Sequence, residues 1–416
     1  MKTKQESLGK AFNRLWAASL ASNISDGLFK TAVPLLATFI TKDPVQIAAL
    51  GAIVMLPWLL FAIPIGTIVD RVDRRKALAF SNAVRLLAGA FLTVSIVGGW
   101  VSIWVLYLVA FVVGAAEVLY DTTAQALIPK LLKPDHLERG NSRLEIGAMV
   151  VGEMVGSPLS GMLFVVAMAI PFVGGNVGIG IALILVLLIP GAFKAPVPAL
   201  GEPRVSMLAD MKFGIKYLYE DKRLLKLVLF TTAVGFWFTA SSSTYVLFLL
   251  DVLKVPTAVF GILMLSGAIG SILGGIYAPK VSKKFGRMNI MSLAIVGSGV
   301  FVFATGFVND LWTWSLLQIL GGISMSFWNI LLMSTYHQII PNELFGRIHG
   351  TRRTLVWGMM PIGAMVGGLI AKFDLRAPMI IGGGIAAVIA LIGLPFVRRL
   401  ASLISEPQPS EQPIQE

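Results

Sequence analysis

The stretch LLAGAFLTVSIVGGWVSIWVLYLVAFVVGAA, Leu86–Ala116, runs for 31 residues without a charged side chain. A helix that crosses the hydrocarbon core of a bilayer needs about 20 apolar residues. Because lipid satisfies no backbone hydrogen bond, an apolar run in a membrane forms a helix or a strand of a closed barrel. Runs this long and this uniformly apolar exclude barrel strands, whose apolar residues alternate with polar ones. The stretch therefore predicts membrane-spanning helices.

Apolar runs of the same kind recur along the chain. Hydrophobic residues make up 56% of the sequence and charged residues 13%, whereas soluble domains carry roughly 25% charged residues. The sequence thus predicts an all-α membrane protein with twelve transmembrane helices. The predicted spans are 13–41, 45–69, 77–98, 101–128, 141–167, 168–192, 225–251, 257–279, 289–308, 311–339, 349–371 and 376–397.

Lysine and arginine gather in alternate loops. Of the 34 such residues, 28 fall on one side of the predicted membrane, four fall on the other, and Lys30 and Arg85 lie inside spans. Cytoplasmic loops carry the excess of positive charge. We therefore expect a multi-pass protein of the cytoplasmic, or inner, membrane with both termini in the cytoplasm. The same clusters explain the net charge of +12 without a nucleic-acid partner.

The longest loop divides the chain into two halves. It starts with Pro196, Pro198 and Pro203 and continues as an amphipathic stretch. The predicted parts are an N-terminal six-helix bundle (1–192), a central cytoplasmic loop with an amphipathic helix (193–224), a C-terminal six-helix bundle (225–397) and a disordered cytoplasmic tail (398–416). An internal repeat supports the division, because QALIP ending at Pro129 resembles HQIIP ending at Pro341, 212 positions later. Two parallel six-helix repeats are the plan of major facilitator transporters.

Enzymatic chemistry finds little support in the sequence. The chain has no cysteine, which excludes disulfides, thiolate metal sites and cysteine nucleophiles. Its three histidines, His136, His337 and His349, have no metal-ligand spacing, and no HExxH motif occurs. An integral membrane enzyme is therefore the less supported alternative, and we expect neither a metal nor a cofactor.

The loop GTIVDRVDRRK, Gly66–Lys76, resembles the cytoplasmic motif between the second and third spans of the major facilitator superfamily. In the family pattern a second glycine stands where this chain has Asp73. A glycine at position 66 lets a neighbouring helix approach closely, and Asp70 can pair with an arginine or a helix N-terminus of the other half. The alternative is that the basic residues only anchor the topology. The resemblance implies a cytoplasmic gating motif formed by Gly66, Asp70, Arg71, Arg74 and Arg75.

The fifth predicted span contains GEMVGSPLSG, which resembles a motif typical of proton-coupled exporters. Its small residues form a smooth helix face that we expect to pack on the eighth span. Generic helix packing, without bearing on the direction of transport, is the alternative. The antiporter-like positions are Gly152, Gly156, Pro158, which is shifted by one relative to the family pattern, and Gly161. The small residues of the eighth span are Gly267, Gly270, Ser271, Gly274 and Gly275.

Within the superfamily the chain resembles the third drug:proton antiporter family, which includes macrolide-efflux and enterobactin-exporter types. The similarity lies in NISDGLFKTAVP (Asn23–Pro34), NAVRLL (Asn82–Leu87), the stretch GAAEVLYDTTAQALIPKLL and the fifth-span motif. It implies a monomeric secondary active transporter that exports a small lipophilic solute or drug by proton antiport with alternating access. The alternatives are an importer of the same fold, a transporter of a specific metabolite, siderophore or lipid, and a passive channel.

Ionisable residues inside spans are costly in lipid and mark candidate functional sites. The predicted proton-coupling or substrate-cavity residues are Asp26, Lys30, Arg85, Glu117, Asp121 and Glu153. Asp26 and Lys30 stand four residues apart on one helix face, so a mutually neutralised pair is their alternative reading. Glu117 and Asp121 are also four apart, and two carboxylates this close in a poorly hydrated cavity cannot both stay ionised. One of them is expected to carry a proton, unless pairing with Arg85 keeps both ionised.

Four aromatic residues are candidates for a lipophilic pocket, because aromatic side chains accept ligands of varied shape. They are Phe236, Trp237, Tyr245 and Trp328. Ordinary packing in the core of the protein is the alternative for each of them.

Overall fold

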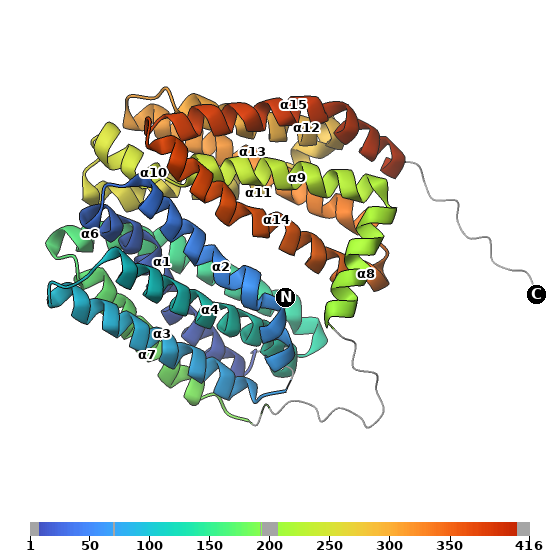
Figure 1. Cartoon of the computed structure of the whole chain (residues 1–416). Helices are drawn as coiled ribbons and strands as arrows, with labels where there is room; N and C mark the ends of the chain where they lie inside the picture. The colour runs from blue at the N-terminus through green and yellow to red at the C-terminus, as the bar shows by residue number, and fades with distance from the viewer. Residues whose placement is uncertain (1–7, 70, 192, 194–206, 406–416) are drawn as a thin grey trace, which may run out of the picture. The chain divides into compact units, whose positions relative to one another are not determined.

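A computed structural model describes residues 8–69, 71–191, 193 and 207–405, and every regular element in these ranges is a helix (Figure 1). The elements are α1 (Lys10–Ile40), α2 (Pro44–Val69), α3 (Arg74–Val97), α4 (Ile103–Leu131), the short 3-10 helix η1 (Pro134–His136), α5 (Leu137–Gly147), η2 (Ala148–Gly156), α6 (Ser157–Val166), α7 (Ile170–Leu187), α8 (Met207–Glu220), α9 (Lys222–Ser242), α10 (Tyr245–Leu247), η3 (Phe248–Val252), α11 (Thr257–Phe285), α12 (Arg287–Thr305), α13 (Leu311–Ile339), α14 (Asn342–Ala371) and α15 (Ala377–Ser405).

Eleven helical runs among the described residues are long and apolar enough to cross a membrane. Two of them combine several elements: η1, α5, η2 and α6 form Pro134–Val166, and α9, α10 and η3 form Lys222–Val252. Helix α1 has 31 residues but is not among the eleven, because polar residues such as Asp26 and Lys30 lower its mean hydropathy. The all-helical membrane fold is therefore confirmed, whereas the twelfth span stays a prediction.

The turn between α3 and α4 shows how the uncharged stretch Leu86–Ala116 is divided into two spans. Gly99 adopts a left-handed backbone conformation with φ of 73°, which glycine reaches without a steric penalty. Ser102 then caps α4, because its side-chain oxygen accepts a hydrogen bond of 3.4 Å from the backbone N–H of Val105. The stretch thus folds into a helical hairpin, with the turn between the predicted spans 77–98 and 101–128.

Two segments are wound as π-helices, in which each backbone N–H bonds the carbonyl five residues earlier. They are η2, with nine residues, and η3, with five. Such winding is rare and is frequent at functional sites. Each segment carries one acidic residue paired with a lysine in or just after α1, namely Glu153 with Lys30 and Asp251 with Lys42.

Contacts between helices divide the chain into two units, Met1–Arg204 with Ser243–Leu265 and Val205–Ser242 with Ser266–Glu416. In the first unit α1 packs against α7 and η2, α2 against α4, and α3 against α4 and α7. In the second unit α12 packs against α13 and α15, and α9 against α14 and α15. Each unit buries its own apolar cluster. The bundles at 1–192 and 225–397 remain a prediction.

Candidate functional site

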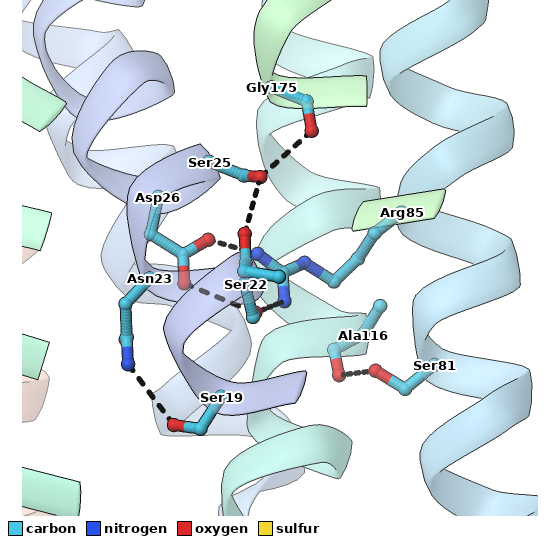
Figure 2. Close-up of polar contacts among 10 residues, drawn as sticks. Ser19, Ser22, Asn23, Ser25, Asp26, Ser81, Arg85, Ala116 and Gly175 are labelled. Carbon is cyan, nitrogen blue, oxygen red and sulfur yellow. Dashed lines mark hydrogen bonds and ion pairs between the residues drawn. The ribbon is translucent and has the colours of Figure 1, made fainter. Parts of the chain in front are cut away.

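An ion pair between α1 and α3 lies at the centre of the first unit. The guanidinium of Arg85, whose side chain is 4% exposed, contacts the carboxylate of Asp26. Its Nη1 also donates a hydrogen bond of 2.8 Å to the hydroxyl of Ser22, one turn before Asp26 on α1 (Figure 2). A buried guanidinium cannot lose its proton and so requires such acceptors. The sequence placed both charges in the membrane but did not identify them as partners.

Small polar side chains hold the backbones around this ion pair in place. Ser25 donates a hydrogen bond of 2.8 Å to the carbonyl of Gly175 and so ties α1 to α7. Ser81 donates one of 2.6 Å to the carbonyl of Ala116 and ties α3 to α4 (Figure 2). These serines were missed by the sequence analysis. For Ser22 and Ser81 the sequence offers one signal: Ser22 stands four positions before Asp26, and Ser81 stands four positions before Arg85.

Lys30 pairs with Glu153 of η2. The alternative reading of a mutually neutralised pair between Asp26 and Lys30 is therefore not found, because each residue pairs with a residue on a different helix. This second pair is more accessible than the first, with Lys30 65% and Glu153 41% exposed. Helix α1 thus forms one buried and one accessible ion pair within little more than one turn.

Glu117 and Asp121 lie on α4 within the electrostatic field of Arg85, which attracts both. Tyr120 lies between them in sequence, and its ring centroid is 5.9 Å from the guanidinium carbon of Arg85. Among the described residues Arg85 forms its one direct ion pair with Asp26. Direct pairing of Arg85 with Glu117 or Asp121 is therefore not found. One guanidinium is thus in direct contact with one carboxylate and attracts two others.

Two further polar groups of this region are buried without a hydrogen-bond partner among the described residues. They are the side-chain amide of Asn82 on α3 and the hydroxyl of Tyr120 on α4. Buried polar groups are nearly always satisfied, so these two stand out as unpaired in a part of the described chain that already holds the ion pair. Both residues lie in stretches that carry the family resemblance, Asn82 in NAVRLL and Tyr120 in GAAEVLYDTTAQALIPKLL, although neither was singled out as a site residue.

The predicted gating motif is described only in part, because Asp70 lies outside the described residues. Arg71 is exposed. Arg74 and Arg75 bind the end of the α7 region: the backbone N–H of Arg74 donates to the carbonyl of Phe193 (3.2 Å), and Nη1 of Arg75 donates to the carbonyl of Ile189 (3.2 Å). The gating role of the motif stays a prediction.

Two positions in this motif differ in detail from expectation. A Cβ built on Gly66 meets no described atom within 4 Å, so the expected close helix approach is not found there. Asp73, which replaces the family's second glycine, accepts a hydrogen bond of 3.1 Å from the backbone N–H of Lys76. It thereby caps α3, because a side-chain acceptor at this position satisfies a free N–H of the first turn.

The small face of the fifth span packs on two partners, not on the stripe predicted from the eighth span. Gly152 and Gly156 lie against α1, where a Cβ on Gly27 would come within 2.0 Å of the carbonyl oxygen of Gly152. Gly161 lies against the start of α11. A Cβ built on Gly161 would lie 3.1 Å from the carbonyl oxygens of Thr257 and Ala258. Pro158 contacts the same helix start at Gly261.

The predicted stripe on the eighth span has a different partner. Gly270 and Gly274 of α11 pack against α13, where built Cβ atoms would lie 2.1 Å from the carbonyl oxygen of Ile319 and 2.8 Å from that of Ile323. Small residues allow this close approach. The fifth span thus meets the eighth span as expected, but at the start of α11 near Thr257–Gly261, whereas the stripe Gly270–Gly274 packs on α13.

The four candidate pocket aromatics are divided between the two units. Trp328 is 3% exposed and packs on Phe230 with ring centroids 5.8 Å apart, inside the apolar cluster of the second unit. The core interpretation therefore holds for it. Phe236 and Trp237 stack edge to face at 5.2 Å in the same unit, whereas Tyr245 belongs to the first.

A surface cavity lies elsewhere in the second unit, among described residues. It measures about 540 Å³ at the corner between α8 and α9, and none of the predicted site residues lines it. Its lining residues are Tyr217, Glu220, Asp221, Lys222 and Arg223. Within the described residues no cluster of three histidine or carboxylate side chains could hold a metal ion.

Comparisons with known proteins agree with this fold. The chain is 21% identical over 402 residues to macrolide efflux protein A of Streptococcus pyogenes, which covers 94% of this chain and 97% of that protein. It is 24% identical over 355 residues to the uncharacterized MFS-type transporter YkuC of Bacillus subtilis, covering 82% and 80%. Both similarities extend over most of the spans.

Solved structures show the same architecture. A variant of the nucleoside transporter NupG superposes with a TM-score of 0.78 at 13% identity and covers 93% of this chain and all of that one. A bacterial homologue of the iron transporter ferroportin, in its inward-facing state, superposes with a TM-score of 0.74 at 15% identity, covering 95% of this chain and all of that one. At such identities the likeness concerns the fold alone. The family model of the Major Facilitator Superfamily matches residues 15–360, and the chain therefore belongs to this superfamily of membrane transporters and is not an enzyme.

Proposed function

We propose that this secondary transporter exports a small lipophilic solute by proton antiport. The observation that carries the proposal is a surplus of carboxylates near one buried cation: Asp26 contacts Arg85, and Glu117 and Asp121 lie within its electrostatic reach. Ionisable residues at this depth of a span are costly and are retained for function. Similarity to macrolide efflux protein A over most of the chain supports the outward direction.

The surplus charge explains how proton and substrate can compete. Arg85 neutralises the carboxylate that it contacts, Asp26, so Glu117 and Asp121 leave excess negative charge in a poorly hydrated region. A proton relieves this charge, and so does a positively charged or strongly polarised group of a substrate. If the two exclude each other, binding of one on one side of the membrane and release on the other gives antiport.

Alternating access then follows the plan that the sequence predicts. The bundles 1–192 and 225–397 would open the site to each side in turn, and the gating motif at Gly66–Arg75 would close the cytoplasmic side. With both termini in the cytoplasm, substrate enters from the cytoplasm or the inner leaflet and leaves on the opposite side.

Transport of a fluorescent lipophilic cation tests the proposal. The purified protein is reconstituted into vesicles, and the population with its cytoplasmic face outward is selected by protease accessibility of the C-terminus. An acid-inside pH gradient should drive the dye into these vesicles against its concentration gradient, and a protonophore should abolish the uptake. The matched control is the Glu117→Gln, Asp121→Asn double variant.

The remaining outcomes distinguish the alternatives. Uptake driven equally by a sodium gradient, with the protonophore present, would contradict proton coupling. Movement of the dye out of the same vesicles under the same gradient would identify an importer. Equal uptake by the double variant would remove Glu117 and Asp121 from the coupling mechanism.

A further inference from the structure

Helix α8 differs from the helices around it in direction. Figure 1 shows it running across the ends of α9 and α14 rather than along them. Asp221 is the one residue between α8 and α9, and its Oδ1 accepts hydrogen bonds from the backbone N–H groups of Arg223 (2.9 Å) and Leu224 (3.3 Å). Because α9 begins a membrane span at Lys222, a helix that crosses its end lies along the membrane surface.

One face of α8 is fixed to the second unit. A Cβ on Gly214 would lie 2.1 Å from the hydroxyl oxygen of Thr351, so the helix backbone rests directly on α14. Leu218, four residues later on the same face, is 2% exposed in the apolar cluster of the unit. These two positions determine which face of α8 points away from the unit.

The outward face combines apolar and cationic side chains. Ile215 is 43% and Tyr219 74% exposed, and the exposed side chains of Lys212 and Lys216 flank them. These positions recur with the spacing of one helix face. Tyrosine is enriched at the level of lipid headgroups, and lysine stems can lie along apolar surface while their ammonium groups reach phosphate.

We propose that this face of α8, defined by Lys212, Ile215, Lys216 and Tyr219, binds the anionic phospholipid surface of the membrane that the protein spans. The basic loops place α8 on the cytoplasmic side by the positive-inside rule, and that leaflet carries the anionic lipids. An amphipathic helix with lysines beside an apolar strip has the chemistry for such a surface. The contact holds the end of α9 at a fixed depth.

Site-specific fluorescence tests this contact, and the chain favours it because it contains no cysteine. A polarity-sensitive fluorophore is attached at Tyr219→Cys or, for comparison, at Glu220→Cys, the next residue, which is 63% exposed and lies 3.7 Å from Lys216 as its ion-pair partner. Glu220→Gln in the Tyr219→Cys protein controls for the loss of that ion pair. These proteins are reconstituted into vesicles of phosphatidylcholine with or without phosphatidylglycerol. Quenching is measured with headgroup-level spin-labelled lipid and with iodide.

The label at position 219 should be quenched mainly by the spin-labelled lipid and the label at 220 mainly by iodide. The additional Lys212→Gln, Lys216→Gln change should weaken lipid quenching at 219 by about twofold or more in phosphatidylglycerol vesicles, with little effect in pure phosphatidylcholine. Iodide quenching at 219 as strong as at 220 would overturn the proposal. If lipid quenching at 219 changes neither when phosphatidylglycerol is left out nor when the two lysines are replaced, anionic headgroups have no role in the contact.

Discussion

Arg85 carries a charge that cannot be removed by deprotonation, in a part of the protein from which solvent is excluded. Its contacts with Asp26 and Ser22 supply the acceptors that such a group requires. Removing one partner of a buried ion pair leaves the other charge uncompensated, whereas removing both leaves none. The two residues should therefore affect stability jointly.

A double-mutant cycle makes this expectation quantitative. Arg85→Met should lower the stability of the detergent-solubilised protein more than the double change Asp26→Asn, Arg85→Met, because only the single variant leaves the Asp26 carboxylate without its cation. The coupling free energy should be on the order of 1–3 kcal/mol, measured as a difference in thermal unfolding at constant detergent. Additive effects of the two single changes would show that the pair contributes nothing as a pair.

The carboxylates of α4 should release protons when substrate binds. Adding the lipophilic cation to wild-type protein in weakly buffered detergent solution should acidify the medium, because in the proposed antiport the substrate displaces a proton from Glu117 or Asp121. The Glu117→Gln, Asp121→Asn variant should release none while still binding substrate. Equal release from both proteins would assign the proton to another group, for which Glu153 is the first candidate.

At the scale of elements, the contact between α1 and η2 depends on glycine. A methyl group at Gly27 would come within 2.0 Å of the carbonyl oxygen of Gly152, a separation that only a shift of one helix can relieve. Gly27→Ala should therefore lower the melting temperature of the protein and the yield of folded protein. Gly51→Ala in α2, where a Cβ meets no described atom within 4 Å, is the matched control and should be neutral. Equal melting temperatures for both variants would mean that the helices separate at little cost.

The positions of these helices were predictable from the sequence, because apolar length and the clustering of charges are local properties. The turn at Gly99 and the membrane depth of Asp26 and Arg85 follow from such patterns. The choice of ion-pair partners could not be predicted from these local patterns. Asp26 binds Arg85, 59 residues away, and Lys30 binds Glu153, 123 residues away, although Asp26 and Lys30 are one turn apart. Only the tertiary fold, which brings the side chain of Arg85 and the π-helix η2 to α1, decides between local and distant partners.

At the scale of the whole molecule, the distribution of 28 against four basic residues predicts the side on which both ends lie. A C-terminal fusion to a reporter that is active only in the cytoplasm should be active, and a fusion to alkaline phosphatase should not. Fusions after Lys42, on the opposite side, serve as the control and should show the reverse pattern. Phosphatase activity of the C-terminal fusion would show that the true topology is the reverse of the predicted one.

Gating should depend on Asp70 but folding should not. Asp70→Asn should reduce transport severalfold while membrane abundance stays near that of wild type, because the change removes a contact of one conformational state and leaves helix packing intact. Asp73→Asn is the control, since asparagine also caps a helix start, and it should transport normally. If Asp70→Asn transports at the wild-type rate across a range of proton gradients, the loop has no gating role and only determines topology.

The winding of η2 has a consequence for how the fifth span can move. Nine residues, Ala148–Gly156, follow i→i+5 hydrogen bonds between two stretches of ordinary α-helix. If one such turn tightened to i→i+4, the helix on one side of it would swivel about its own axis by roughly 100°, the angle of one residue. Glu153 would turn away from Lys30 while Gly161 kept its place against α11. The winding thus gives the span a place where a change in hydrogen-bond pattern would turn one part of the helix relative to the other.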